Sequence, residues 1–319
     1  MTQYALNRIL LTIPTLIAVT IIVFVSVRFL PGDVVDHIVG EDYGAATPEY
    51  RATLLEYYSL DDSMPQQYAR WIFDLVQGDL GTSILSGRSV QGEIGHRLPT
   101  SAFLGILAAI IGLAVALPVG ILAALKQDTI ADYLSRTFAI VLLAVPNFWL
   151  ALLIITYGFI WFGWTPPLRY HRFWEEPLAS MQTLWVPAVI LSGSLMAVVM
   201  RFLRSSMLEV LRQDYIRTAR AKGLKERTVV TRHVFRNAMI PVVTVIGLSL
   251  PDLIGGTVII ETIFTIPGLG KYLFDSIQTR DYPVVQGVVL LGAIFTIVAN
   301  LMVDLSYSVI DPRIRYGGR

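Results

Sequence analysis

The chain contains no cysteine among its 319 residues. Disulfide bonds, thiolate nucleophiles, iron–sulfur clusters and thiolate zinc sites are therefore excluded. Charge is also scarce, since only 15% of the residues are Asp, Glu, Lys or Arg and the net charge is +1. Charged residues make up about a quarter of an ordinary soluble domain. Nothing in this balance indicates a nucleic-acid partner, and we expect none.

Histidine is nearly as rare as cysteine. The four histidines all fall in predicted loops, and none has the spacing of a metal-binding helix: His37, His96, His171 and His233. No apolar segment holds a histidine that could activate a serine within the membrane. The chain also lacks the glycine-rich phosphate-binding motif of nucleotide hydrolases. We therefore predict that it is not an enzyme and that it binds no metal, cofactor or nucleotide.

Apolar residues are abundant instead, at 54% of the chain, and the mean hydropathy is +0.61. A helix needs about 20 apolar residues to cross a bilayer, and six segments qualify: 9–30, 100–125, 134–162, 186–203, 240–260 and 284–305. The sequence thus predicts an all-α polytopic membrane protein with six transmembrane helices. The first segment exceeds the roughly 7–15 apolar residues of a signal peptide, so we predict an uncleaved span.

The charges are sorted by segment, which predicts an orientation. Residues 31–99 carry four arginines against eleven acidic residues, whereas residues 201–236 carry ten basic residues against three acidic ones. The first segment should lie outside and the second in the cytoplasm, which places both termini in the cytoplasm. We predict three regions: a tail and first span at 1–30, an external helical cap at 31–99, and a five-helix core at 100–319.

The external cap has a readable local pattern. Apolar spacing predicts helices at 48–58 and 65–76, and glycines at 78, 81 and 87 predict a turn-rich loop after them. The second span has a different pattern, in which a small residue recurs every fourth position: Ala108, Gly112, Ala116, Gly120 and Ala124. Such a face allows another helix backbone to approach closely.

The basic segment at about 204–238 separates spans four and five. Leu208, Leu211, Tyr215 and Ala219 are spaced as one stripe of a helix, and Gly223 is placed to end it. Residues 225–237 predict a second short helix, with Pro241 at the start of the next span. Two helices joined by a glycine indicate a docking element for a soluble partner. The alternative is a basic loop that only fixes topology and contacts lipid headgroups.

Particular motifs in this segment carry a resemblance. The stretch YIRTARAKGL at 215–224, followed by RHVFRNAMIPVVTVIGL at 232–248, resembles the ATPase-coupling loop of permease subunits of bacterial ABC importers, in the dipeptide and oligopeptide branch. Further motifs resemble the same branch in the same order: LPGD at 30–33, GDLGTS at 78–83, RSSMLEVL at 204–211, ETIFTIPGLG at 261–270, RDYPVVQGVVLL at 280–291 and DPRIR at 311–315. The resemblance therefore covers essentially the whole chain.

The resemblance implies a type I ABC importer permease fold in the bacterial cytoplasmic membrane. It implies a second permease subunit, two ABC ATPase subunits, and a periplasmic or lipid-anchored substrate-binding protein as partners. The residues expected to couple to the ATPase are Tyr215, Arg217, Thr218, Ala219, Lys222, Gly223 and Leu224. The chain departs from the broad importer signature, which has Glu-Ala-Ala, three residues, then Gly, because only Ala219 and Gly223 match it.

Polar residues inside predicted spans are candidates for the translocation pathway, because a charge there is costly. Asp252 lies beyond the middle of the fifth span, and Asn147 follows Pro146 in the third. We predict that both line the pathway and that Asp252 attracts a cationic or amino-terminal group. Two alternatives stay open for Asp252: pairing with the partner permease, or bonding to backbone near Pro251. For Asn147 the alternative is bonding to backbone freed by Pro146.

The function predicted is that of a permease subunit which forms, with a second permease, the pathway for short peptides. The alternative is an ion-coupled carrier or channel that works without ATPase subunits, with Asp252 and Asp304 as proton or cation sites. The sequence does not select among dipeptides, oligopeptides, glutathione, nickel chelates, haem, opines and oligosaccharides.

Overall fold

A computed structural model describes residues 2–29, 35, 48–167 and 169–310, with the side chains of the first and last helices described from Thr12 and up to Val303. The chain divides into two compact units. Unit 1 comprises Met1–Ser101 and Pro267–Ile297, and unit 2 comprises Ala102–Ile266 and Val298–Arg319. Each unit is described by itself.

The described residues are helical almost throughout. The helices are α1 (Thr2–Arg28), α3 (Pro48–Tyr57), α4 (Met64–Val76), α5 (Val90–Leu125), α6 (Ile130–Ala144), α7 (Asn147–Phe162), α8 (Pro177–Leu211), α9 (Asp214–Ala221), α10 (Glu226–Thr228), the π-helix η1 (Val229–Phe235), α11 (Arg236–Ile263), α12 (Leu269–Gln278) and α13 (Tyr282–Ile310). Helices α5 and α13 each contribute residues to both units. The two helices predicted in the external cap are confirmed as α3 and α4.

Arg28 at the end of α1 holds three helices of unit 1 together. Its guanidinium donates hydrogen bonds to the side-chain oxygen of Gln67 on α4, the shorter at 2.6 Å. It also lies over the ring of Tyr282 at the start of α13, 4.4 Å from the ring centre. Val27 and Val285 are buried beside Tyr282. The positive charge is thus spread over an amide oxygen and an aromatic face, both of which attract cations.

A short hairpin in unit 1 is tied to α13 by the buried carboxylate of Asp281. The Ser83 hydroxyl and the Ile84 N–H both donate to this carboxylate. Burial raises the pKa of Asp281 above its usual range, while these two hydrogen bonds oppose the shift. The predicted glycine-punctuated loop is confirmed, since Gly78, Gly81 and Gly87 all have positive φ.

Unit 2 is built around α8. The most apolar 18-residue window of α8 is 78% buried, against 28% for α5 and 22% for the helical run Glu226–Ile263. Among the described residues, four helices are long and apolar enough to cross a membrane, and the bent pair α6 and α7 makes a fifth candidate. Thr12–Arg28 is a shorter apolar helix. The count of six spans and the placement of the termini stay predictions.

The face of small residues on α5 is confirmed as a close-packing surface. Ala108, Ala116 and Ala124 are buried. A Cβ added to Gly112 would lie 3.3 Å from the carbonyl oxygen of Ser192 on α8, and one added to Gly120 would lie 3.2 Å from that of Met200. Backbone therefore approaches backbone along this face, as small residues permit between membrane helices.

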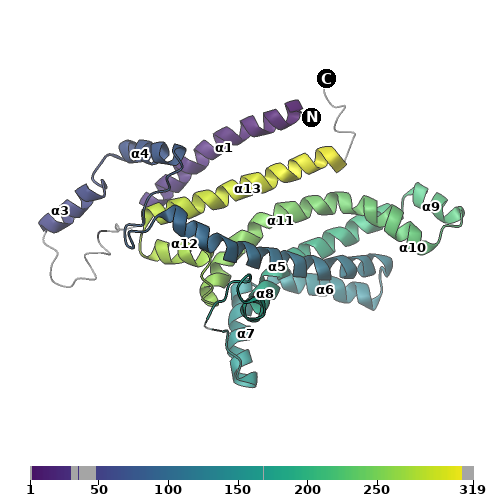
Figure 1. Ribbon diagram of the computed structural model, residues 1–319. Coiled ribbons are helices and arrows are strands. Elements are labelled where there is room, and N and C mark those ends of the chain that lie inside the picture. The colour runs from purple at the N-terminus through teal and green to yellow at the C-terminus, as the bar shows by residue number, and fades with distance from the viewer. Residues whose placement is uncertain (1, 30–34, 36–47, 168, 311–319) are drawn as a thin grey trace. The chain divides into compact units, whose positions relative to one another are not determined.

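The third predicted span is two helices. The chain leaves helical geometry at Val145 and Pro146, and α7 begins at Asn147 with an axis bent by 96° from that of α6 (Figure 1). Proline disfavours helical backbone in the residue before it, which accounts for the extended conformation of Val145. A single span at 134–162 would be nearly straight, so this bend departs from the prediction.

Two details of the predicted basic segment are wrong. The stripe was expected to run through one helix from Leu208 to Ala219, but α8 ends at Leu211 and α9 starts anew after Gln213. This break shifts the register, so Ile216 is buried and Tyr215 is exposed. The second helix is not short either, because η1 continues into α11 and the helical run extends unbroken from Glu226 to Ile263, with Pro241 inside it.

Substitution Gly120→Val should destabilise the protein, because the added side chain collides with Met200 and Leu203 of α8. Overpacking of this kind costs about 1–3 kcal/mol, so we expect a lower thermal unfolding temperature of the purified protein. Gly105→Val is the matched control on the same helix, since a Cβ at Gly105 meets no atom within 4 Å. Equal unfolding temperatures for the two variants would contradict close packing at Gly120.

Candidate functional site

Helix α9 presents most of the predicted coupling residues on its surface. Ile216 and Ala219 are buried among residues of unit 2, including Val229 and Val234 of η1. Ile216 was not among the predicted coupling residues, and those other than Ala219 are exposed: Tyr215, Arg217, Thr218, Lys222, Gly223 and Leu224. Two of them, Tyr215 and Leu224, are apolar or aromatic side chains exposed by 46% and 41%. The helix is therefore anchored on one face and open on the other.

The corner after α9 is rigidly specified. Gly223 has φ +77°, a conformation that glycine adopts without strain. The N–H of Gly223 donates to Arg220 and that of Leu224 to Ala219, which closes the end of the helix. Across the corner, the guanidinium of Arg220 donates two hydrogen bonds to the carboxylate of Glu226, at 2.7 and 3.1 Å. The prediction that Gly223 ends this helix is confirmed.

The connection from α10 into α11 passes through η1, a π-helix of seven residues. Val229 and Val234 are buried, and η1 contacts both α8 and α9. π-Helical turns are rare and occur often at functional sites. Here the wider turn joins the exposed α9 to the long helix α11 that carries Asp252.

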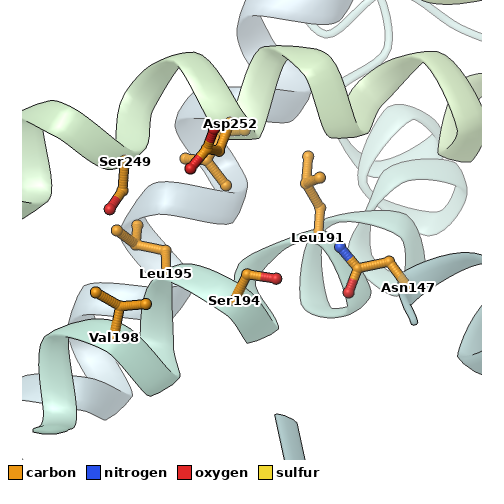
Figure 2. A pocket seen from close by; sticks show the side chains of 8 residues that line it. Asn147, Leu191, Ser194, Leu195, Val198, Ser249 and Asp252 are labelled. Atoms are coloured by element: carbon orange, nitrogen blue, oxygen red, sulfur yellow. The ribbon is translucent and has the colours of Figure 1, made fainter. Parts of the chain in front are cut away.

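A pocket of about 80 Å³ lies between α7, α8 and α11. Figure 2 shows Asp252 extending from α11, Ser194 from α8, and Asn147 from the beginning of α7. Leu191, Leu195, Val198, Ser249 and Leu253 complete the lining. The structure thus brings together Asp252 and Asn147, which are 105 positions apart and which the sequence singled out independently.

The side chains of Asp252 and Asn147 make no hydrogen bond to nearby backbone groups in the described part of the chain. Asp252 is exposed in the single chain, and no residue that the structure describes donates a hydrogen bond to its carboxylate. Asn147 likewise makes no side-chain hydrogen bond within the described part, while the carbonyl of Pro146 is taken by the N–H of Leu150. The alternatives in which these side chains satisfy backbone freed by Pro251 and Pro146 find no support. Their place in the pathway stays a prediction.

Ser249 and Ser194 also face this pocket but were not expected. The Ser249 hydroxyl donates to the carbonyl of Val245, 2.8 Å away. Its oxygen retains acceptor capacity toward the pocket. Serine is common on packed faces of membrane helices, so sequence alone does not distinguish these two from other serines.

The buried ion pair between Asp132 and Arg204 is a second feature that the sequence did not reveal. Arg204 on α8 donates two hydrogen bonds, at 2.6 and 2.8 Å, to the fully buried carboxylate of Asp132 on α6. The N–H of Asp128 donates a third, and Arg136 lies 3.7 Å away. An acidic residue at the start of an apolar span was a signal that Asp132 needs a partner. The sequence did not identify that partner, because Arg204 is 72 positions away.

No group of three or more His, Cys, Asp or Glu side chains in the described part of the chain is arranged to hold a metal ion. The described residues thus present an exposed face on α9 and a small pocket lined by both polar and apolar side chains.

A protein-family model described as "Binding-protein-dependent transport system inner membrane component" matches residues 116–316. The chain belongs to this family. It is therefore a membrane component of a transport system that works with a binding protein, and the family resemblance drawn from its motifs is confirmed. The matched region includes α6 to α11 and hence both α9 and the pocket.

Two relatives match along their whole length. The oligopeptide transport system permease protein AppB of Bacillus subtilis (strain 168) is 40% identical over 319 residues, covering 99% of this chain and 100% of the relative. The dipeptide transport system permease protein DppB of Escherichia coli (strain K12) is 42% identical over 339 residues, covering 99% of both. The family member described here is thus similar throughout to proteins named as peptide permeases.

A solved structure of the methionine ABC transporter MetNI, in an inward-facing conformation, shares the fold. The TM-score is 0.53 at 16% sequence identity, and the match covers 69% of this chain and 97% of that one. An amino acid ABC transporter gives a TM-score of 0.50 at 18% identity. The fold is therefore that of a type I ABC importer permease.

Substitution Asp132→Asn should destabilise this family member, because it leaves Arg204, whose side chain is only 19% exposed, opposite a neutral group. Breaking one side of a buried ion pair typically costs about 3–5 kcal/mol. We expect a lower unfolding temperature, with partial recovery in the double variant Asp132→Asn, Arg204→Gln. The control Asp214→Asn removes an exposed pair with Arg217 and should change stability little. If Asp132→Asn behaved like this control, the pair would not contribute to stability.

Proposed function

We propose that the chain is the permease subunit of an ATP-driven importer of short peptides in the bacterial cytoplasmic membrane. A second permease would complete the pathway, two ABC ATPase subunits would supply the energy, and a binding protein would deliver the peptide. The observation that carries the peptide assignment is the full-length similarity to a dipeptide and an oligopeptide permease. ATP hydrolysis then belongs to the ATPase subunits and not to this chain.

The geometry of α9 supports the coupling role. A helix that docks into an ATPase must pack one face against its own subunit and leave the other face exposed. Helix α9 meets both conditions, because Ile216 is buried and Tyr215 is exposed. The buried Ile216 and Ala219 of α9 pack with Val229 and Val234 of η1, so a push on α9 would be passed to η1 as movement of a rigid element. Rigid-body movement of packed elements is the usual form of such coupling.

The double variant Tyr215→Ala, Leu224→Ala should uncouple ATP hydrolysis from uptake. Tyrosine is enriched among the side chains that dominate binding energy at protein interfaces, and truncating such a side chain costs about 2 kcal/mol or more. We expect peptide uptake into cells to fall about thirtyfold or more, while membrane insertion and unfolding temperature stay unchanged.

Leu178→Ala is the matched control for this variant, because Leu178 is 83% exposed and lies at the opposite end of α8. Uptake that persists when ATP hydrolysis is blocked, and that instead follows an ion gradient, would overturn the proposal in favour of an ion-coupled carrier. Wild-type uptake by the double variant would exclude α9 as the docking element.

The pocket between α7, α8 and α11 supports a role for Asp252 in the pathway. A carboxylate inside a membrane protein requires a partner or water, and Asp252 has no hydrogen-bonding partner in the described part of this chain. In the proposed assembly its partner would be the passing substrate, whose amino terminus is positively charged. Asn147, Ser194 and Ser249 add neutral polar groups around it.

The variant Asp252→Asn should lower uptake selectively by substrate charge. Loss of one carboxylate should reduce uptake of peptides with an additional lysine or arginine severalfold more than that of acidic peptides, since the attraction depends on charge. Ser249→Ala changes the same pocket without changing its charge and should affect all peptides alike. Equal rates of wild type and Asp252→Asn for cationic, neutral and acidic peptides would remove Asp252 from the pathway.

A further inference from the structure

A second pocket, of about 270 Å³, lies in unit 2 between α5, α6 and α8. Its lining falls into two kinds of residue. The polar set comprises Ser135, Arg136, Arg201, Arg204 and Ser205, and the apolar set comprises Gly120, Ala123, Ala139, Ile140, Leu143 and Met200. Nothing in the proposed peptide pathway or in the docking of α9 uses this pocket.

The charges in this pocket are unbalanced. Arg204 is neutralised by its two hydrogen bonds to Asp132. Arg136 approaches the same carboxylate only to 3.7 Å, and its Nε is buried with no hydrogen-bond partner in the described structure. Arg201 is exposed and lies over the ring of Phe202, 5.8 Å from the ring centre. No acidic residue lines the pocket, so two guanidinium groups remain available to an anion.

The apolar set distinguishes the ligand from a small soluble anion. Ile140 and Leu143 of α6 lie one turn and nearly two turns after Arg136, and they are 65% and 42% exposed. Apolar surface directly next to a cationic site is suited to a molecule that has both an anionic group and a hydrocarbon chain. Basic pockets between membrane helices bind anionic phospholipid headgroups in this way.

We propose that this pocket binds one anionic phospholipid, with the phosphate between Arg136 and Arg201 and an acyl chain along Ile140 and Leu143. Tyr133 supports the site, because the guanidinium of Arg136 lies 4.5 Å from the centre of its ring. The bound lipid fills a gap between α5, α6 and α8. The lipid would lie next to the ion pair of Asp132 and Arg204, and its headgroup would separate this pair from the acyl chains of the bilayer.

The test is lipid retention by the intact protein, purified in detergent with the subunits that accompany it. The protein is placed in nanodiscs of phosphatidylethanolamine with phosphatidylglycerol, released, and analysed by native mass spectrometry for retained lipid. We expect phosphatidylglycerol to be retained in preference to phosphatidylethanolamine. Two basic side chains near a headgroup correspond to roughly thirtyfold in affinity, so Arg136→Gln, Arg201→Gln should reduce retention by about that factor.

Matched variants separate this site from general basic charge. Arg232→Gln removes an exposed arginine of η1 outside the pocket and should leave retention unchanged. Arg136→Lys, Arg201→Lys keeps the charges and should retain the lipid, which excludes misfolding as the cause of loss. Equal retention by the glutamine double variant and the wild type, or no preference for the anionic lipid, would overturn the proposal.

A photocrosslinking residue in place of Ile140 identifies what covers the pocket. Crosslinks to phosphatidylglycerol support the proposal. Crosslinks to a second permease subunit would show that protein covers this surface, and would overturn it. Displacement of the lipid by millimolar inorganic phosphate would also overturn it, because a free anion does not replace the apolar contacts with Ile140 and Leu143.

Discussion

Close packing on α8 is the constraint from which the rest of unit 2 follows. Lipid tails are as apolar as leucine, so membrane helices associate through tight van der Waals contact and not through the hydrophobic effect. Helix α8 is by far the most buried of the long apolar helices in the described chain. Small residues of α5 bring its backbone onto α8 from one side, and α11 makes the most extensive helix contact with α8 from another. The remaining polar residues of this unit lie where packing leaves space.

Local patterns in the sequence predicted most of the long helices and several helix ends, but not α12 or the π-helix η1. Apolar segments predicted the spans, a four-residue repeat predicted the packing face with Gly112 and Gly120, and Gly223 predicted the end of α9. Each of these signals depends on a few neighbouring residues. They fail where one helix gives way to another without a strong breaker, as at Arg212 and Gln213, where the residues themselves are compatible with helix. On α9 the predicted stripe was therefore right at Ala219 and wrong at Tyr215, where the neighbouring Ile216 is buried instead.

Contacts between residues far apart in the chain could not be predicted from local sequence patterns. Asp132 and Arg204 are each ordinary residues near the ends of apolar segments, and only the fold places them 2.6 Å apart. The pocket shared by Asn147 and Asp252 lies at the 96° bend between α6 and α7, because Asn147 is the first residue of α7. A proline within a span indicates freed backbone groups but does not give the angle of a bend. Polarity in an apolar segment identified the right residues, and tertiary packing determined which of them meet.

The two arginine environments on α6 and α8 show how burial decides the role of a charge. Arg204 and Arg136 both approach Asp132, yet one carboxylate already accepts two hydrogen bonds from Arg204 and one from the backbone of Asp128. Its acceptor positions are nearly filled, so the weaker contact with Arg136 does not satisfy that guanidinium. An arginine side chain offers five N–H donors and no acceptor. Its remaining donors must therefore find water, lipid phosphate or another protein, and the apolar surface of Ile140 and Leu143 beside it favours lipid.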